Sequence, residues 1–208
     1  MLPPTRETSA RTALTVALLG LVLLSFALRI YQLDGQSLWG DEAWSLFHAT
    51  RQSVSDVLRS AHDDGVVPPA YYLILHSWIP AVGQSEFAIR YMSVLYGVLA
   101  VPALFALGHR LGGMGTGIIA ALLQTLSPFH VYYSQETRMY AQMTFLIILS
   151  TYFFWRLFTE TASRAWKMWA CYAVASALAV NSHYFAWYVI LAHALLWLGD
   201  LTWRRLAA

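Results

Sequence analysis

Long apolar runs constrain this chain more than any other feature. A helix that crosses about 30 Å of hydrocarbon needs roughly 20 largely apolar residues, and the 208-residue sequence contains several runs of that kind. Only 12% of the residues are charged and 58% are apolar, whereas soluble domains have roughly 25% and 45–50%. These proportions exclude an ordinary soluble enzyme and a disordered chain, and no basic stripe is present for nucleic acid. The sequence predicts an all-α integral membrane protein.

Six membrane spans are expected from the positions of the apolar runs. In chain order they are residues 12–28, 88–108, 114–131, 139–158, 166–180 and 184–203. The last two come from one stretch without Asp, Glu, Lys or Arg, residues 168–199, which is too long for a single span. Asn181, Ser182 and His183 lie near its middle, so we expect a hairpin there. Residues 1–208 are expected to form one transmembrane domain.

The first apolar run has two interpretations. Residues 25–27, Ser-Phe-Ala, resemble the cleavage site of a secretory signal peptide. The run is longer than the core of a usual signal peptide, and further spans follow it. Both features favour an uncleaved anchor.

Basic residues in the loops predict the orientation. With the N-terminus in the cytoplasm, eight Lys or Arg residues lie inside and five outside, as the positive-inside rule requires. The eight are Arg6, Arg11, Arg110, Arg156, Arg164, Lys167, Arg204 and Arg205. Eight of the eleven acidic residues then lie outside. Because acidic residues do not set topology, their accumulation indicates that the extracytoplasmic face of a plasma (inner) membrane protein carries the chemistry.

The segment between the first two spans, residues 29–87, is too long for a plain connection. It contains three expected amphipathic helices. The first begins at Gly40, and the second follows Ser53, which is a favourable N-cap residue. The third follows a Pro-Pro pair and covers residues 70–78, before Pro80. It is too short to span a bilayer, so we expect it to lie in the membrane interface.

Two acidic residues stand at the start of the first of these helices. Asp41 and Glu42 follow Trp39 and Gly40. One interpretation is helix-start chemistry, because Asp caps free amides and Glu complements the helix dipole. The other is a general base at the membrane surface, directed toward a lipid-borne substrate.

A second polar segment, Gln135-Glu136-Thr137-Arg138, follows the third expected span on the same side. One interpretation is a solvated loop with a Glu136–Arg138 pair. The other places Glu136 opposite Asp41 and leaves Arg138 available to a phosphate.

Two further polar residues have simple explanations when taken alone. Asp64 precedes a glycine and two prolines, as expected for a turn. His183 stands at the tip of the last hairpin, where it can serve as an interfacial hydrogen-bonding residue. The histidines form no convincing metal set, so we assign no metal or other cofactor, and a divalent metal stays open.

Five segments stand in a characteristic order along the chain: residues 39–42 (WGDE), 68–73 (PPAYYL), 86–90 (EFAIR), 133–140 (YSQETRMY) and 181–185 (NSHYF). In this order the chain resembles the N-terminal part of the integral-membrane glycosyltransferases related to protein O-mannosyltransferases and lipid A aminoarabinose transferases, which share the C-type glycosyltransferase fold. The resemblance covers about residues 12–203.

The resemblance implies a reaction and a set of roles. A sugar passes from a polyprenyl-phosphate donor to an acceptor hydroxyl on the extracytoplasmic face, with inversion at the anomeric carbon. The acceptor can be a protein, a lipid or a glycan. Asp41 is the implied general base, and Glu42 and Glu136 are further catalytic candidates. Arg138 is assigned to the donor phosphate from charge chemistry. The candidate pocket residues are Trp39, Gln135, Tyr140, Asp64 and His183.

The sequence departs from the family pattern in two ways. Val67 stands where members often have His, which weakens a metal or phosphate role there. Family members are also usually much longer, so we expect the chain to be the N-terminal portion of a larger fold. The alternative is a non-catalytic membrane protein that keeps the fold and binds polyprenyl phosphate or a partner subunit.

Overall fold

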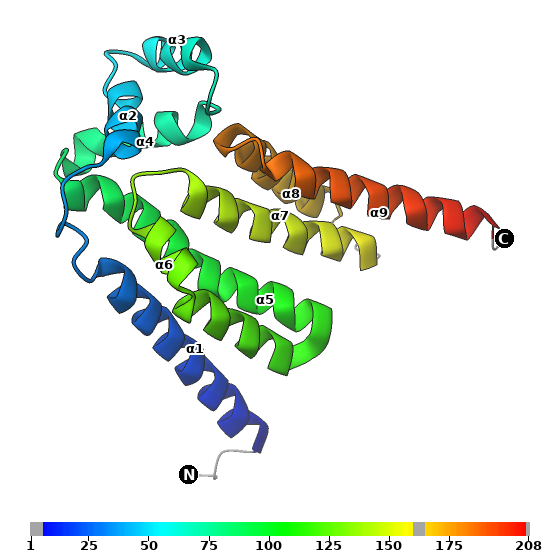
Figure 1. Ribbon diagram of the computed structural model, residues 1–208. Coiled ribbons are helices and arrows are strands. Elements are labelled where there is room, and N and C mark those ends of the chain that lie inside the picture. The colour runs from blue at the N-terminus through cyan, green and yellow to red at the C-terminus, as the bar shows by residue number, and fades with distance from the viewer. Residues whose placement is uncertain (1–5, 160–164, 207–208) are drawn as a thin grey trace.

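The computed structural model describes residues 6–159 and 165–206, and every regular element in these ranges is a helix (Figure 1). The all-α prediction is confirmed for this part of the chain. The longer helices are α1 (Arg6–Ile30), α5 (Glu86–Leu126), α7 (Tyr140–Thr159), α8 (Ala165–Ser182) and α9 (Ala186–Leu206). The shorter helices are α2 (Gly40–Ala49), α3 (Val54–Asp64), α4 (Ala70–Val82) and α6 (Pro128–Ser134).

Three helical segments are long and apolar enough to cross a membrane. They are Arg11–Ile30, Glu86–Leu126 and Tyr140–Thr159. α8 and α9 lie where the last two spans are expected, but the number of six spans stays a prediction. The charge bias also stays a prediction. The structure does not describe the side chains of four of the basic residues that contribute to it: Arg6, Arg164, Arg204 and Arg205.

α5 consists of two antiparallel limbs, drawn in green in Figure 1. The chain reverses at Gly112 and Gly113, which depart from helical geometry, and Gly113 has a left-handed φ of 83° that glycine adopts without strain. Close packing of the limbs depends on Gly108 and Gly117: a Cβ atom on Gly117 would lie 2.8 Å from the carbonyl oxygen of Phe105. The reversal lies between the second and third expected spans.

The expected third span, residues 114–131, is wrong at its C-terminal end. α5 ends at Leu126, and α6 begins at Pro128. Proline has no amide to donate and disfavours a helical conformation in the residue before it. Ser127 is accordingly extended, and its hydroxyl accepts a hydrogen bond from the amide of His130 at 3.5 Å, starting a new helix.

The helices of the segment between α1 and α5 begin as expected. The Ser53 hydroxyl accepts the amide of Asp56 at 3.2 Å, which caps α3. α4 begins after the proline pair, but it continues to Val82, so the expected end at residue 78 is wrong. Pro80 lies in the last turn of α4, where its missing amide removes only one helical hydrogen bond.

α2, α3 and α4 gather at one end of the long helices (Figure 1). Their core is centred on α4, where Tyr71, Tyr72 and Leu75 are fully buried. Val57 of α3 and Ile89 of α5 belong to the same apolar cluster. This packing holds the short helices against the first turns of α5 and so positions the N-terminal end of α2 in space.

A buried arginine fastens α1 to the second limb of α5 and to α6. Arg29 is fully buried and donates to the carbonyl oxygen of Gln124 at 2.9 Å. It also donates to the hydroxyls of Ser25 at 2.6 Å and Ser134 at 3.2 Å. Ser25 and Arg29 lie in the same continuous helix, α1, and the uncleaved anchor stays a prediction.

We expect Gly117→Ala to destabilise the protein by about 1–3 kcal/mol, because the new methyl group would overlap the backbone of the opposite limb of α5. Gly115→Ala is the matched control, since a Cβ atom at Gly115 meets nothing within 4 Å. Thermal unfolding of the protein in detergent measures the difference. Equal melting temperatures for the two variants would contradict the close packing of the limbs.

Candidate functional site

Glu42 joins three separate segments of the chain. Its fully buried carboxylate accepts hydrogen bonds from Arg90 of α5, from Nε at 2.8 Å and from Nη2 at 2.7 Å. The amide of Thr137 donates to the same carboxylate at 2.8 Å, and the amide of Trp39 does so at 3.4 Å. α2, α5 and the segment after α6 therefore meet at one carboxylate.

Arg90 extends this connection to the loop after α1. Its remaining N–H groups donate to three backbone carbonyls, those of Leu33 at 2.8 Å, Gln36 at 2.8 Å and Ser37 at 3.3 Å. Burial acts to raise the pKa of Glu42, but the hydrogen bonds from Arg90 and Thr137 outweigh it, and the pKa of Glu42 lies below its ordinary value. Glu42 is thus an ionised carboxylate whose hydrogen bonds are all made within the protein.

Asp41 has a different environment from its neighbour. Its side chain is 52% exposed, and its Oδ2 lies 3.5 Å from Nη2 of Arg138. Nη1 of Arg138 donates to the backbone carbonyl of Asp41 at 3.1 Å and to the Ser45 hydroxyl at 3.2 Å. The ion pair observed for Arg138 is therefore with Asp41, and the Arg138 Nε is buried with no hydrogen-bond partner.

Glu136 is also buried, but unlike Glu42 it has no charged partner that satisfies both carboxyl oxygens. It is only 5% exposed, and its Oε2 is buried without a hydrogen-bond partner. Burial raises the pKa of Glu136, the nearby charge of Glu42 adds to this increase, and the Tyr132 hydroxyl and Arg138 oppose it. The pKa of Glu136 therefore lies above that of an ordinary carboxyl group, opposite in direction to the change at Glu42.

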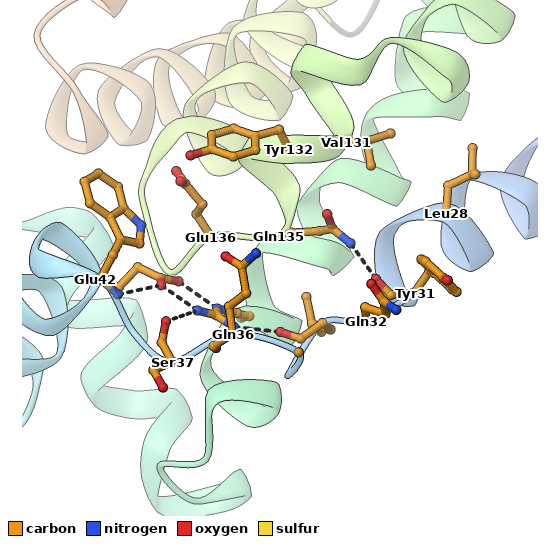
Figure 2. A pocket seen from close by; sticks show the side chains of 14 residues that line it. Leu28, Tyr31, Gln32, Gln36, Ser37, Glu42, Val131, Tyr132, Gln135 and Glu136 are labelled. Carbon is orange, nitrogen blue, oxygen red and sulfur yellow. Dashed lines mark hydrogen bonds and ion pairs between the residues drawn. The ribbon is translucent and has the colours of Figure 1, made fainter.

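A cavity of about 590 Å³ lies beside Glu136, between the end of α1, the loop before α2, and α6 (Figure 2). Trp39, Gln36, Tyr132 and Gln135 contribute to its lining, and the Tyr132 hydroxyl faces the Glu136 carboxyl group. The side-chain amide of Gln135 donates to the backbone carbonyl of Tyr31 at 2.9 Å, and this hydrogen bond joins the end of α6 to the end of α1 beside the cavity.

The other expected site residues lie away from this cavity. The Tyr140 ring lies 5.8 Å from the Arg138 guanidinium carbon and 5.8 Å from the His183 ring. Asp64 accepts the indole N–H of Trp44 at 3.2 Å. The structure thus divides the sequence-predicted residues into two groups. One contains Asp41, Arg138, Tyr140 and His183, with Asp64 nearby at the end of α3; the other contains Trp39, Glu42, Gln135 and Glu136.

Sequence reasoning missed the role of two arginines. Arg90 and Arg29 stand near the ends of apolar helices, and both are buried. Ionisable residues at such positions are costly unless they find a partner or a cavity. This signal was available in the sequence, although it does not say which partner each arginine finds.

The described residues contain no group of three or more His, Cys, Asp or Glu side chains arranged to hold a metal ion. The site consists of carboxylates, arginines, amides and aromatic rings at one end of the long helices.

The apolar helices together with this ionisable cluster define an integral membrane protein with a polar site at one end of its helices. A family model, dolichyl-phosphate-mannose-protein mannosyltransferase, matches residues 66–208. The chain belongs to this family of membrane glycosyltransferases, which use polyprenyl-phosphate sugar donors. The match includes Glu136, Arg138 and His183 and begins after Asp41 and Glu42. No curated protein and no solved structure matches the chain.

Glu42→Gln is expected to destabilise the protein by about 3–5 kcal/mol, because it leaves the Arg90 guanidinium buried without its charged partner. Asp63→Asn, which changes an exposed acid of the neighbouring helix α3, is the control. Thermal unfolding in detergent measures both variants.

The pH dependence of the stability gives a second test of the same ion pair. Since the pKa of Glu42 is lowered by folding, its contribution is present at neutral pH and is lost as the pH falls through that lowered pKa. The difference between wild type and Glu42→Gln should therefore shrink in acid, below the ordinary carboxyl pKa of about 4. A constant difference from pH 7 to acid would contradict an ionised Glu42.

Proposed function

We propose that this protein transfers a sugar from a polyprenyl-phosphate donor to an acceptor hydroxyl group, with Asp41 as the general base. The acceptor is a protein, a lipid or a glycan, and the anomeric carbon inverts. The observation that carries this proposal is the half-exposed carboxylate of Asp41, held at the start of α2 by a buried arginine.

The three acids support a division of roles. Glu42 is fully occupied by Arg90 and backbone amides, so we assign it a positioning role. Glu136 is buried and has a raised pKa. Asp41 alone among the three is open to an incoming hydroxyl group. Carboxylates whose environments differ in this way commonly divide their functions within one site.

The transfer step needs a base for the acceptor proton and a cation near the leaving phosphate. The acceptor oxygen forms a bond to the anomeric carbon while Asp41 takes its proton. The bond from that carbon to the phosphate oxygen breaks, and the phosphate leaves with the electron pair. Negative charge grows on the leaving phosphate, so a nearby cation lowers the barrier. Arg138, with its unpartnered Nε, is our candidate for that cation.

The active face is proposed to be extracytoplasmic in the plasma (inner) membrane, with the N-terminus in the cytoplasm. The positive-inside bias of the loops supports this orientation. One face would carry the whole site, because α2, α3 and α4 gather at one end of the long helices (Figure 1), and the acids Asp41, Glu42 and Glu136 meet there.

Asp41→Asn is expected to lower the transfer rate by about a hundredfold or more, the usual contribution of a general base. Its melting temperature should stay close to that of wild type, because the side chain is half exposed and keeps its shape. Incorporation of labelled mannose from polyprenyl-phosphate mannose into the protein, lipid and glycan fractions of native membranes measures transfer.

The same assay separates the alternatives, with Asp63→Asn as the control that should retain transfer. Wild-type rates for Asp41→Asn would remove Asp41 as the base. A wild-type protein that binds polyprenyl phosphate but transfers no sugar would instead support the non-catalytic alternative.

Arg138→Ala is expected to raise the KM for the donor about tenfold or more beyond any change in the KM for the acceptor. A charge-assisted hydrogen bond to phosphate contributes about 1.5–3 kcal/mol, and each 1.4 kcal/mol corresponds to about a tenfold change in affinity. Arg59→Ala, which removes an exposed arginine of α3, is the control. Equal increases for donor and acceptor would show that Arg138 does not select the phosphate.

A further inference from the structure

We infer that the cavity beside Glu136 binds the ring of a neutral sugar. This inference rests on the proposed transfer reaction and specifies which part of a substrate the cavity takes. The sugar can belong to the donor or to a saccharide acceptor, because both present the same ring of hydroxyl groups. The experiment below distinguishes these two sources.

The first argument is the unpartnered carboxyl oxygen of Glu136. The residue is only 5% exposed, and its Oε2 has no hydrogen-bond partner within the protein. A buried polar group left without a partner is destabilising. This carboxyl group lines the cavity, so a ligand hydroxyl group placed there would supply the missing hydrogen bond.

The second argument is the chemistry of the remaining lining. Trp39 is 46% exposed and Tyr132 is 57% exposed, so both rings are open to a ligand. Gln36 and Gln135 add amide groups that both donate and accept. A pyranose has an apolar face of C–H groups and a rim of hydroxyl groups. Aromatic rings and amides around one carboxyl group match both parts of such a ring.

The third argument is that the cavity disfavours a phosphate. Arg90 is the single Lys or Arg among the described residues that line it. Its guanidinium is already bound to Glu42 and to the carbonyls of Leu33 and Gln36. The carboxyl group of Glu136 and these carbonyls repel an anion. Arg138, the candidate for the donor phosphate, does not line the cavity.

The fourth argument is position. Trp39 and Glu42 line the cavity, and they precede and follow Asp41 in the sequence. The cavity therefore borders the start of α2, although Asp41 itself does not line it. Its volume of about 590 Å³ lies within the usual range of ligand pockets, about 300–1,000 Å³. A sugar bound there would lie next to the place where the transfer reaction is proposed.

The test measures binding to the full chain in lipid nanodiscs without turnover. The probes are polyprenyl phosphate, polyprenyl-phosphate mannose and methyl α-mannoside, the last followed by saturation-transfer NMR. The variants are Glu136→Leu, which keeps the volume but removes the carboxyl group, and Trp39→Ala at an exposed ring. The control is Asp63→Asn. If one variant fails to fold, the other still tests the same cavity.

Both variants are expected to weaken a sugar-bearing probe by about tenfold, as the loss of about 1.4 kcal/mol of binding energy implies. Polyprenyl phosphate should keep its affinity within about twofold. Weakened polyprenyl-phosphate mannose identifies the donor sugar as the occupant. Weakened methyl α-mannoside with unchanged polyprenyl-phosphate mannose identifies an acceptor sugar.

Two results would overturn the inference. One is an equal loss of affinity for polyprenyl phosphate and polyprenyl-phosphate mannose, which would make the cavity a phosphate or lipid site. The other is unchanged binding of all three probes. The test measures binding without turnover, so a failure of Asp41 as the base would not alter its outcome.

Discussion

The buried ion pair between Glu42 and Arg90 organises the end of the molecule that carries the site. It links α2 and α5, which are 48 residues apart at these positions, and it adds the loop after α1 and the segment after α6 through backbone groups. A buried ion pair gains stability only when its remaining hydrogen-bonding groups are satisfied, because removing both charges from water is costly. Here the backbone supplies those partners.

This pair also explains why neighbouring acids differ. Because Glu42 is bound by Arg90, it holds the first turn of α2 in place and leaves Asp41 at the surface beside Arg138. The amide of Thr137 that binds Glu42 also fixes the backbone next to Glu136, which is buried against the cavity. One ion pair thus places an exposed acid, Asp41, and a buried acid, Glu136, at the same end of the molecule.

Local signals in the sequence predicted most of the helices. They did not predict which side chains from distant segments pair with one another. The Ser53 cap and the start at Gly40 depend on adjacent residues, so their pattern is readable. The break at Ser127 was also readable from the following proline, but the apolar run concealed it. By contrast, nothing in the local spacing says that Glu42 pairs with Arg90, or that Arg138 pairs with Asp41 in place of Glu136. Those pairings follow from how distant helices pack.

The two buried arginines hold different segments of the chain around the cavity. The buried guanidinium of Arg29 donates hydrogen bonds to carbonyl and hydroxyl oxygens of α1, α5 and α6. That of Arg90 donates to the Glu42 carboxylate and to backbone carbonyls of the loop after α1. Each arginine therefore fixes a different wall of the same space. Charged groups at the ends of apolar helices persist only when such partners are present. The polar cavity lies between the segments that Arg90 and Arg29 bind, namely the loop after α1, α6 and the start of α2.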